Sequence, residues 1–422
     1  MKITIFTLGT RGDVQPFAVL GRALAEKGHD VTLSTAKNFK SLVRSYNLKF
    51  HPVDADYEEI LNSKEGRKIL QVNLFAIQRN LNRLIFPLIE KSLNEFYLLA
   101  KESDLIIYRP KTFVDVFADQ LKGRAIRAAV IPAVEETAAF LNPMFSALKL
   151  PFFLNKLSYK FNHLRYSFFR KPLEQFCERN GLTPPVNLKS EVPFIYGISR
   201  HFLEKPSDWP EHNYLTGFWF PDPHGSLSQD LTDFIDAGAT PLAITFGSMP
   251  IKKEIKSLII KSLKKTPYRY IIVKGWADWE IDDLDKSKFN VISSVSFPDL
   301  FPKVRAVIHH GGIGTTAECL RAGKPMFICP VLYPVGDQFF WGDLAHSKGV
   351  AVKPVPLTKL TAPVFIERIM ELVENRQLYQ AATELAQKIT SEDGLKKAVE
   401  IIENLGEQQQ FTLADACPEA PI

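Results

Sequence analysis

The most informative stretch of the sequence is Ala306-Val-Ile-His-His-Gly-Gly-Ile-Gly-Thr-Thr-Ala-Glu-Cys-Leu320. It predicts a short strand over its first residues, a turn that contains three glycines, and a helix that opens at Thr315 or Thr316. Free backbone N–H groups and the positive end of the helix dipole then converge in front of these threonines. Such a point binds anions, most naturally phosphate. The alternative is an ordinary glycine-rich strand-to-helix connection with a threonine cap.

This stretch does not fit other known glycine-rich motifs. The sequence contains no G-x-x-x-x-G-K-[ST], which excludes a P-loop. Ala317 stands where the third glycine of a dinucleotide fingerprint belongs. His310-Gly-Gly312 resembles the oxyanion loop of lipases, but no G-x-S-x-G is present to supply a nucleophile. A phosphate site is the interpretation that remains.

Composition narrows the class of protein. The chain has 422 residues and is 45% hydrophobic, enough for the cores of two or three domains. No apolar run approaches the roughly 18 residues of a membrane span, and the N-terminal segment is a poor signal peptide. The four cysteines show neither metal nor redox spacing, which fits a reducing cytoplasm. The net charge of +5 is mild, and no nucleic-acid-binding motif accompanies it.

Strand and helix patterns alternate in two series, which predicts an α/β fold with parallel sheets. We expect two doubly wound, Rossmann-like domains that face each other across a cleft. The first spans 1–216 and the second 229–395, joined by a linker rich in proline and glycine at 217–228. A closing helix is expected at 396–407 and a disordered tail at 408–422. The expected strands are 2–8, 30–34, 105–108, 125–131, 242–246, 270–274, 290–293, 306–309 and 326–329.

Four polar loops are expected at the carboxyl ends of strands, where ligands of open α/β sheets bind. They are 9–15, 245–249, 309–316 and 336–338. Gly247 and Ser248 offer additional backbone and hydroxyl donors. Asp337 and Gln338 suit paired hydrogen bonds to sugar hydroxyls, although this dipeptide is also common on protein surfaces. Together, the four loops predict a nucleotide-sugar site.

At this point the chain resembles a family. It is similar to the family 1 glycosyltransferases of GT-B fold, in particular to the sterol, macrolide and glycopeptide glycosyltransferases. The resemblance implies inverting, metal-independent transfer of a hexose, most simply glucose, from a nucleotide diphosphate sugar such as UDP-glucose, with no further cofactor. The residues that carry it are Gly9-Thr-Arg-Gly-Asp-Val-Gln-Pro16, Gly217-Phe-Trp-Phe220, His309-His-Gly-Gly-Ile-Gly-Thr-Thr316, Leu320-Arg-Ala-Gly-Lys-Pro325 and Gly336-Asp-Gln-Phe-Phe-Trp341.

The resemblance also implies roles for single residues. His310 and the backbone from Gly312 to Thr316, including Gly314 and Thr315, should bind the diphosphate. A structural cap is the alternative for His310. The other matched donor-binding positions are Gly12, Gly247 and Ser248, with Ser248 among the phosphate contacts, then Glu318 at the ribose hydroxyls, and Asp337 and Gln338 at the transferred sugar.

Asp13 is the candidate general base. An acceptor hydroxyl must lose its proton as it attacks the anomeric carbon, and a neighbouring carboxylate can accept that proton. In bacterial members of the family, an aspartate at this position is assigned this role. The alternative is that Asp13 and Gln15 cap a helix expected at Pro16–Lys27. Arg11 is expected on the acceptor side, either positioning Asp13 or touching the donor.

The acceptor side has an unusual composition. Residues 137–173 contain no Asp or Glu, while aromatic residues alternate with lysines and arginines. This favours contact between 140–171 and anionic lipid headgroups, as in a peripheral protein on the inner face of a membrane. The alternative is a pair of helices whose aromatic residues are core. Segment 72–99 is also apolar, and the residues expected on the acceptor side are Phe75, Phe140 and Phe145.

These features favour a hydrophobic acceptor, such as a sterol, a carotenoid or another lipid alcohol. A soluble polyketide or polyphenol aglycone is the second candidate. A nucleotide-sugar 2-epimerase shares the architecture but needs no acceptor. A non-catalytic module that binds a nucleotide sugar or a lipid is the remaining alternative.

Overall fold

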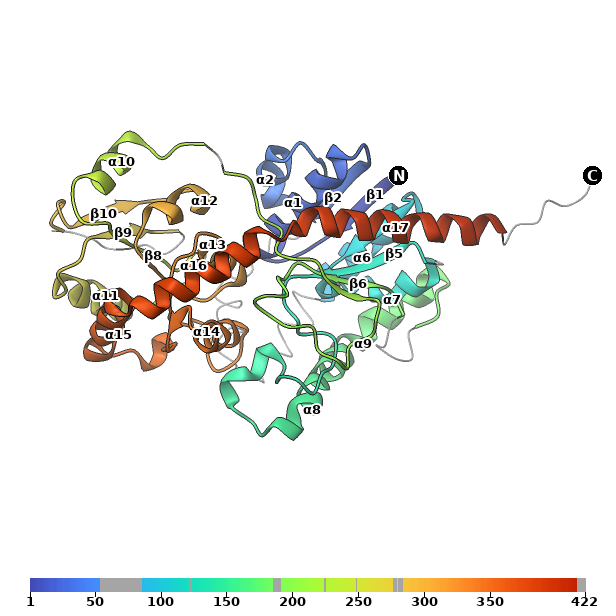
Figure 1. Cartoon of the computed structure of the whole chain (residues 1–422). Coiled ribbons are helices and arrows are strands. Elements are labelled where there is room, and N and C mark those ends of the chain that lie inside the picture. Colours follow the sequence, from blue (N-terminus) through green and yellow to red (C-terminus); the bar gives the residue numbers. More distant parts are fainter. Residues whose placement is uncertain are drawn as a thin grey trace, which may run out of the picture.

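The computed structural model describes residues 1–53, 86–121, 123–184, 191–223, 225–247, 249–275, 279 and 284–415, without the side chains of 163–166 and 408–415. Two sheets of parallel strands, one in each half of the chain, form its framework (Figure 1). The predicted fold class is therefore confirmed. The domain limits expected from the sequence stay a prediction.

The first sheet has the strand order β3-β2-β1-β4-β5-β6-β7. Its strands alternate between two buried faces, because successive side chains of a strand point to opposite sides. Ile3 and Ile5 face one core, whereas Ile106 and Tyr108 face the other. The strands are β1 (Lys2–Phe6), β2 (Asp30–Ala36), β3 (Lys49–Val53), β4 (Leu105–Tyr108), β5 (Ala125–Ala129), β6 (Phe194–Tyr196) and β7 (Asn213–Leu215).

The second sheet has the order β10-β9-β8-β11-β12-β13. It is covered on both faces as well: Ile244 and Ile308 lie in one core, and Ala243 and Val307 in the other. The strands are β8 (Leu242–Thr245), β9 (Tyr270–Val273), β10 (Phe289–Ile292), β11 (Val307–His309), β12 (Met326–Ile328) and β13 (Ala351–Val352).

Helices cover the sheets on both sides, as the alternating buried faces require. They are α1 (Arg11–Glu26), α2 (Lys40–Ser45), α6 (Phe86–Lys101), α7 (Asp115–Ala118), α8 (Asn155–Tyr159), α9 (Phe161–Asn180), α10 (Gln229–Asp236), α11 (Lys253–Lys264), α12 (Phe297–Leu300), α13 (Ile313–Arg321), α14 (Gln338–Ser347), α15 (Ala362–Glu374), α16 (Arg376–Thr390) and α17 (Gly394–Asp415). Short 3-10 turns are η1 (Lys37–Phe39), η3 (Pro110–Thr112), η4 (Asp119–Leu121), η5 (Pro143–Leu148), η6 (Phe152–Leu154), η7 (Phe301–Lys303) and η8 (Leu357–Lys359). Within the described part of the chain, no helix combines the length and the apolar character that crossing a bilayer requires.

Helix α17 returns from the second domain to the first (Figure 1). It packs against α1, and Glu403 accepts a hydrogen bond at 3.0 Å from His29 in the turn before β2. The helix is longer than the closing helix expected at 396–407. It continues to Asp415, into the stretch from 408 onward for which a disordered tail is predicted.

One core cluster runs through both domains. It contains Ile5 and Phe17 of the first domain, Val307 and Trp341 of the second, and Trp219 of the segment between them. The Phe17 and Trp219 rings meet edge to face, with centroids 5.8 Å apart. The predicted linker is therefore partly a core element rather than a solvated tether.

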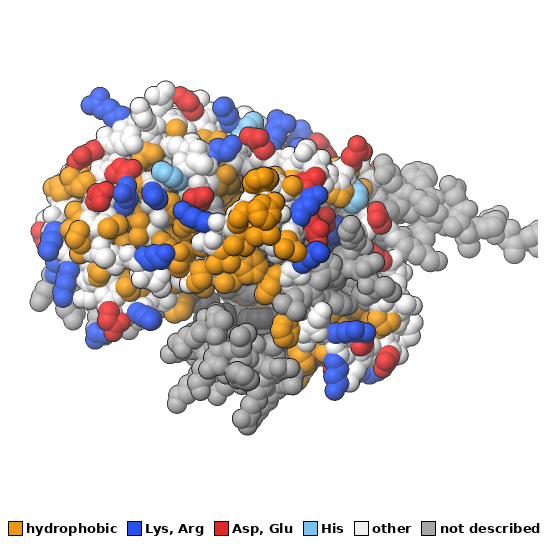
Figure 2. Space-filling view, turned by 90° about the horizontal axis from the view of Figure 1, so that it is seen from below, with side chains coloured by type: hydrophobic (Ala, Val, Ile, Leu, Met, Phe, Trp, Pro, Cys, Tyr) orange, Lys and Arg blue, Asp and Glu red, His pale blue; other side chains and the backbone are white. Residues whose placement is uncertain are grey.

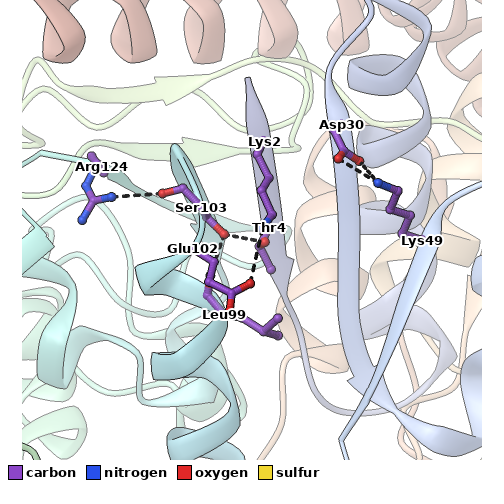
Figure 3. A network of polar contacts seen from close by, with 8 residues as sticks. All are labelled: Lys2, Thr4, Asp30, Lys49, Leu99, Glu102, Ser103 and Arg124. Atoms are coloured by element: carbon purple, nitrogen blue, oxygen red, sulfur yellow. Dashed lines mark hydrogen bonds and ion pairs between the residues drawn. The ribbon is translucent and has the colours of Figure 1, made fainter.

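The amino ends of the first sheet's strands are closed by a polar network (Figure 3). The Thr4 and Ser103 hydroxyls lie 2.7 Å apart, and Arg124 donates to the Ser103 carbonyl at 3.1 Å. At the surface, Lys49 pairs with Asp30 at 2.6 Å. These polar groups bind one another, so the amino edge of the sheet serves to hold neighbouring strands together. The opposite, carboxyl edge carries the residues that the sequence singled out.

Candidate active site

Both sheets have a topological switch point, where the strand order reverses direction. In the first sheet it lies between β1 and β4, and in the second between β8 and β11. Connections leave neighbouring strands toward opposite faces there, which opens a crevice at the carboxyl ends of the strands. The segments that follow these four strands contain Asp13, in the first turn of α1, and Arg109, Gly247 and His310, in loops. Topology therefore brings together residues that are far apart in the sequence.

At the first switch point, Asp13 closes the first turn of α1. Its Oδ2 accepts hydrogen bonds from the Thr10 backbone N–H at 2.8 Å and from the Thr10 hydroxyl at 3.2 Å. Gly9 has a φ of +140°, and a Cβ built there would lie 2.1 Å from the same Oδ2. The carboxylate thus occupies the space that only a glycine leaves open.

The helix begins earlier than the sequence predicted. Thr10 is the N-cap and α1 starts at Arg11, so residues 11–15 are helical and the expected start at Pro16 is wrong. Asp13 does cap this helix, as the alternative held, but Gln15 does not share the task. Gln15 accepts from Arg11 at 3.0 Å and donates to the Tyr46 hydroxyl at 3.2 Å.

Two cations after β4 hold the other oxygen of Asp13. Arg109, which is almost fully buried, forms an ion pair with Oδ1, and the Lys111 ammonium lies 3.9 Å from it. Burial alone would raise the pKa of Asp13, but the charges of Arg109 and Lys111 and the Thr10 hydrogen bond outweigh it and lower that pKa to about 2. Asp13 is therefore ionised throughout the physiological range.

The second switch point is made of glycines and an uncharged imidazole. His310 follows β11 directly, and a Cβ added at Gly312 would lie 2.5 Å from its Nε2. A Cβ at Gly247, which has a φ of +58°, would lie 3.3 Å from its Cε1. Burial lowers the pKa of His310 to about 4, so the ring is neutral at physiological pH.

Several donors converge here without a protein partner. The His310 Nδ1 is buried and makes no hydrogen bond to the described residues. Helix α13 begins beside it with Gly312 as N-cap, which leaves the N–H groups of its first turn without intrahelical acceptors. An anion in front of the helix would satisfy both sets of groups.

The expected start of this helix needs a correction. Helix α13 opens at Ile313, not at Thr315 or Thr316, so the anion point lies before Ile313 and Gly314. Thr316 is fully buried, and its hydroxyl donates back to the Gly312 carbonyl at 3.0 Å. The Thr316 hydroxyl is therefore occupied within the helix. Gly314 is exposed in the first turn, and Thr315 is nearly buried in it.

Glu318 lies on the same helix, one turn further on. Its carboxylate is buried and pairs with Arg321 at 2.6 Å. Burial raises its pKa to about 7, although the Arg321 charge partly opposes this rise. Arg321 in turn donates to the Pro221 carbonyl at 3.0 Å and lies 4.5 Å from the Phe220 ring centroid. Glu318 is thus linked to the segment between the domains.

Asp337 and Gln338 both take structural partners at the start of α14. Asp337 accepts from the Trp341 indole N–H at 2.9 Å. The Gln338 carbonyl accepts from the N–H groups of Val331 at 2.7 Å and Leu332 at 2.9 Å. It therefore secures the 330–336 loop, and its amide NH2 is the group left to donate elsewhere.

The two domains meet at these residues. Burial raises the pKa of Asp337, while the Lys111 charge lowers it and the Asp13 charge raises it. Such coupling requires Asp13, Lys111 and Asp337 to lie within electrostatic range of one another. The Gly336 N–H also donates to the Met144 carbonyl of the first domain at 2.9 Å. The carboxyl edges of the two sheets thus face each other with charged groups between them.

Other predicted residues are not part of this arrangement. Phe140 packs on Phe340 across the domain contact, with ring centroids 5.4 Å apart. Phe145 packs on Phe161 at 4.8 Å. Gly12 lies in the exposed first turn of α1, beside Arg11. Ser248 and Phe75 lie outside the described residues.

Sequence reasoning missed Arg109 and Lys111. A signal was present, because both lie within three residues after an expected strand, and basic residues at a strand's carboxyl end are placed where ligands bind. No set of side chains suited to a metal ion occurs among the described residues. The expected absence of a metal is not tested by this observation.

Comparison with known proteins identifies the class. Residues 3–98 match the glycosyltransferase family 28 N-terminal domain. The fold resembles the glycosyltransferase VinC in complex with dTDP (TM-score 0.67, 17% identity, 97% of this chain and 100% of that chain). It also resembles SnogD from Streptomyces nogalater (TM-score 0.65, 17% identity, 96% of this chain and 99% of that chain). At this identity the likeness shows the GT-B fold alone.

Sequence relatives are more similar. A sterol 3-beta-glucosyltransferase of Arabidopsis thaliana is 30% identical over 95% of this chain and 67% of its own length. The O-mycaminosyltylonolide 6-deoxyallosyltransferase of Streptomyces fradiae is 27% identical over 96% of this chain and 98% of its length. Fungal relatives are much longer, and the chain spans 28% of the sterol 3-beta-glucosyltransferase of Yarrowia lipolytica, with 28% identity. The chain belongs to the nucleotide-sugar glycosyltransferases of GT-B fold that are related to sterol and macrolide glycosyltransferases.

Proposed function

We propose that this protein transfers a hexose, most simply glucose, from a nucleoside diphosphate sugar such as UDP-glucose to a hydroxyl group of a hydrophobic acceptor. The observation that carries the proposal is the contact of the two domains beside both sites: the Gly336 N–H, next to Asp337, donates to the Met144 carbonyl, and the Lys111 ammonium, 3.9 Å from the Asp13 Oδ1, also acts on the charge of Asp337. It joins a candidate base to a candidate sugar contact. Relatives named as sterol 3-beta-glucosyltransferases support a sterol or another lipid alcohol as acceptor.

The second switch point holds the donor in this proposal. The first-turn N–H groups of α13 and the His310 imidazole receive the diphosphate, and Gly247 leaves room for it. Glu318 and the Gln338 NH2 contact the ribose and the sugar, and Ser248 remains a predicted phosphate contact. Asp337 accepts from a sugar hydroxyl while Trp341 holds its other side.

The first switch point acts on the acceptor. The acceptor oxygen forms a bond to the anomeric carbon while the bond from that carbon to the diphosphate oxygen breaks, which inverts the configuration. The acceptor proton passes to Asp13. A carboxylate with a pKa of about 2 is a weak base, but the oxygen becomes strongly acidic as it bonds to the anomeric carbon, so a late proton transfer suffices. Arg109 is a positioning residue that keeps Asp13 ionised and oriented.

Two measurements test this proposal. First, sugar nucleotides are incubated with lipid and polyphenol acceptors, and products are read by mass spectrometry; a hexosylated lipid alcohol is expected. Second, Asp13→Asn should lower turnover by about 10²–10⁴-fold while it leaves donor affinity unchanged, because the amide cannot accept the proton. Unchanged turnover would remove Asp13 as the base, and sugar-nucleotide conversion without acceptor would favour an epimerase.

A soluble polyketide acceptor is the second candidate. It is favoured by the 27% identity to the O-mycaminosyltylonolide 6-deoxyallosyltransferase, which this chain matches over nearly the whole length of both proteins. The same acceptor screen separates the two. Product formed only with soluble aglycones would replace the lipid alcohol with a polyketide-like substrate.

A further inference from the structure

Exposed apolar side chains gather on one segment of the first domain. Nine large hydrophobic side chains are exposed among the described residues, and seven of them come from 148–168. We call the surface that they form the η5–α9 face. It is visible as a continuous apolar area in the view from below (Figure 2), the side on which α8 lies in Figure 1. Its members are Leu148, Leu150, Phe152, Phe153, Leu157, Phe161 and Phe168.

The exposure is built into the fold. Phe152 and Phe153 are 82% and 70% exposed, yet Tyr159, a few residues later, is fully buried in the domain. The Asn155 side chain donates to the Ala138 carbonyl at 2.8 Å. Ser158 accepts from the Asn142 N–H at 2.9 Å. The backbone is therefore anchored, and the two phenylalanines are held outward rather than left over from a loose loop.

The stretch of chain that forms this face carries basic residues and no acidic ones. No acid occurs between residues 137 and 173. Lys149, Lys160 and Lys171 are exposed and form no ion pair with another described residue. Lys156 and Arg170 pair with Asp208 and Glu174, which lie outside that stretch. Aromatic side chains flanked by unpaired lysines match the chemistry of an anionic lipid surface, which offers acyl chains below a layer of negative headgroups.

We propose that the η5–α9 face docks on an anionic bilayer, with Phe152 and Phe153 inserted among the lipids and the lysines at the headgroups. A second copy of the chain fits this face less well, because a symmetric contact would bring the same unpaired lysines together. This inference concerns the surface alone and does not depend on which donor or acceptor the enzyme uses.

The docked orientation has a consequence for the site. The Met144 carbonyl within η5 accepts from the Gly336 N–H, next to Asp337. Phe140, just before η5, packs on Phe340 of α14. The lipid-facing surface is therefore continuous with the loop that borders the candidate sugar contact. A bilayer bound here lies beside the place where an acceptor hydroxyl has to arrive.

The test is binding of the full chain to vesicles without any substrate. Flotation with phosphatidylcholine vesicles that contain about a quarter phosphatidylglycerol should recover the protein, whereas pure phosphatidylcholine should recover little and added salt should release it. Phe152→Ser with Phe153→Ser should weaken binding at least about tenfold, because two aromatic side chains lose their apolar burial. Lys160→Glu with Lys171→Glu should weaken it about as strongly.

Matched controls change the same chemistry elsewhere. Leu98→Ser removes an apolar side chain that is 58% exposed on α6, and Lys261→Glu with Lys265→Glu reverses two charges at α11. Both should bind vesicles as the unchanged protein does. Retained nucleotide binding shows that each variant is folded. Absence of vesicle binding by the unchanged protein, or full binding by the Phe152/Phe153 variant, overturns the proposal; a dimer that only this variant loses would assign the face to a second copy instead.

Discussion

The two switch points have the same topology and opposite chemistry. At the first, the Asp13 carboxylate already has its partners, Thr10 and Arg109, and closes its own helix. At the second, the His310 Nδ1 and the first turn of α13 lack partners among the described residues. A complete polar cluster is stable without a ligand, whereas unsatisfied buried donors gain most from one. The first switch point is therefore organised to orient the Asp13 carboxylate, and the second to bind an anionic ligand.

The largest effect on turnover among the substitutions that compare the two switch points is expected for Gly9→Ala, which adds a single methyl group at the first of them. Gly9→Ala places a Cβ 2.1 Å from the Asp13 Oδ2 and demands a φ of +140° from an alanine. The carboxylate must leave its place, so turnover should fall at least about 100-fold while nucleotide affinity changes little. Steady-state kinetics and titration with the nucleoside diphosphate measure the two quantities separately.

A matched control for Gly9→Ala lies on the second domain. Gly238→Ala adds a methyl group whose nearest neighbour, an Arg269 nitrogen, lies at 3.4 Å, and it should leave both quantities unchanged. If Gly9→Ala lowers nucleotide affinity as strongly as turnover, the division of labour between the two switch points is wrong.

The reciprocal substitution at the second switch point should give the opposite pattern. Gly312→Ala brings a Cβ to 2.5 Å from the His310 Nε2, so the ring must move away from the anion point. We expect donor affinity to fall about tenfold or more, since a charge-assisted contact is lost, with a smaller change in turnover at saturating donor. A loss of turnover without loss of affinity would contradict donor binding at this loop.

A third substitution probes how Arg109 acts. Arg109 holds the pKa of Asp13 at about 2, and Arg109→Gln removes that charge, so the pKa of Asp13 rises. A rate that needs ionised Asp13 is then lost at higher pH than before, and the acid limb of the pH–rate profile shifts toward neutral. At pH 7.5 we expect only a few-fold loss of turnover.

Lys111→Gln is the graded comparison for Arg109. Its ammonium lies 3.9 Å from the Asp13 Oδ1, farther than the Arg109 guanidinium, and should shift the acid limb less. A purely structural Arg109 would lower activity equally at all pH values and leave the profile in place.

The sequence predicted the sheets better than the helix starts. Strands such as Leu105–Tyr108 are continuous apolar runs, which are readable because both faces of a parallel strand are buried. The predicted start of α1 at Pro16 is wrong because Thr10 and Asp13 close a turn before this proline, which lies inside the helix. The two-residue strand Ala351–Val352, by contrast, is too short for any periodicity to reveal.

The site could be predicted only where its residues are local. His310 and the glycines beside it form one continuous motif, so a phosphate site could be predicted there without knowing the fold. Arg109 meets Asp13 because β4 lies next to β1, a pairing between segments about a hundred residues apart. Similarly, the sequence alone left open whether the aromatics of 140–171 are core, because Tyr159 is buried and Phe152 exposed within one stretch of similar composition.

The smallest expected effect is on the stability of the fold rather than on catalysis. Asp13 and Glu318 are the buried acids of the two switch points, and their pKa values move in opposite directions, to about 2 and about 7. Because the pKa of Glu318 is raised in the folded state, between about pH 4.5 and 7 the folded protein keeps the Glu318 proton while the unfolded chain releases it. Its contribution to stability is full below about pH 4.5 and is lost as the pH rises toward 7.

Glu318→Gln should remove this pH dependence, worth up to about 3 kcal/mol between the two ends of the window. Urea unfolding at several pH values measures it. Glu367→Gln is the control, because Glu367 also pairs with an arginine, Arg368, but is largely exposed. If the unchanged protein gains stability from pH 5 to 7 and Glu318→Gln abolishes that gain, then Glu318 is held as a carboxylate by Arg321, and the second switch point carries a fixed charge like the first.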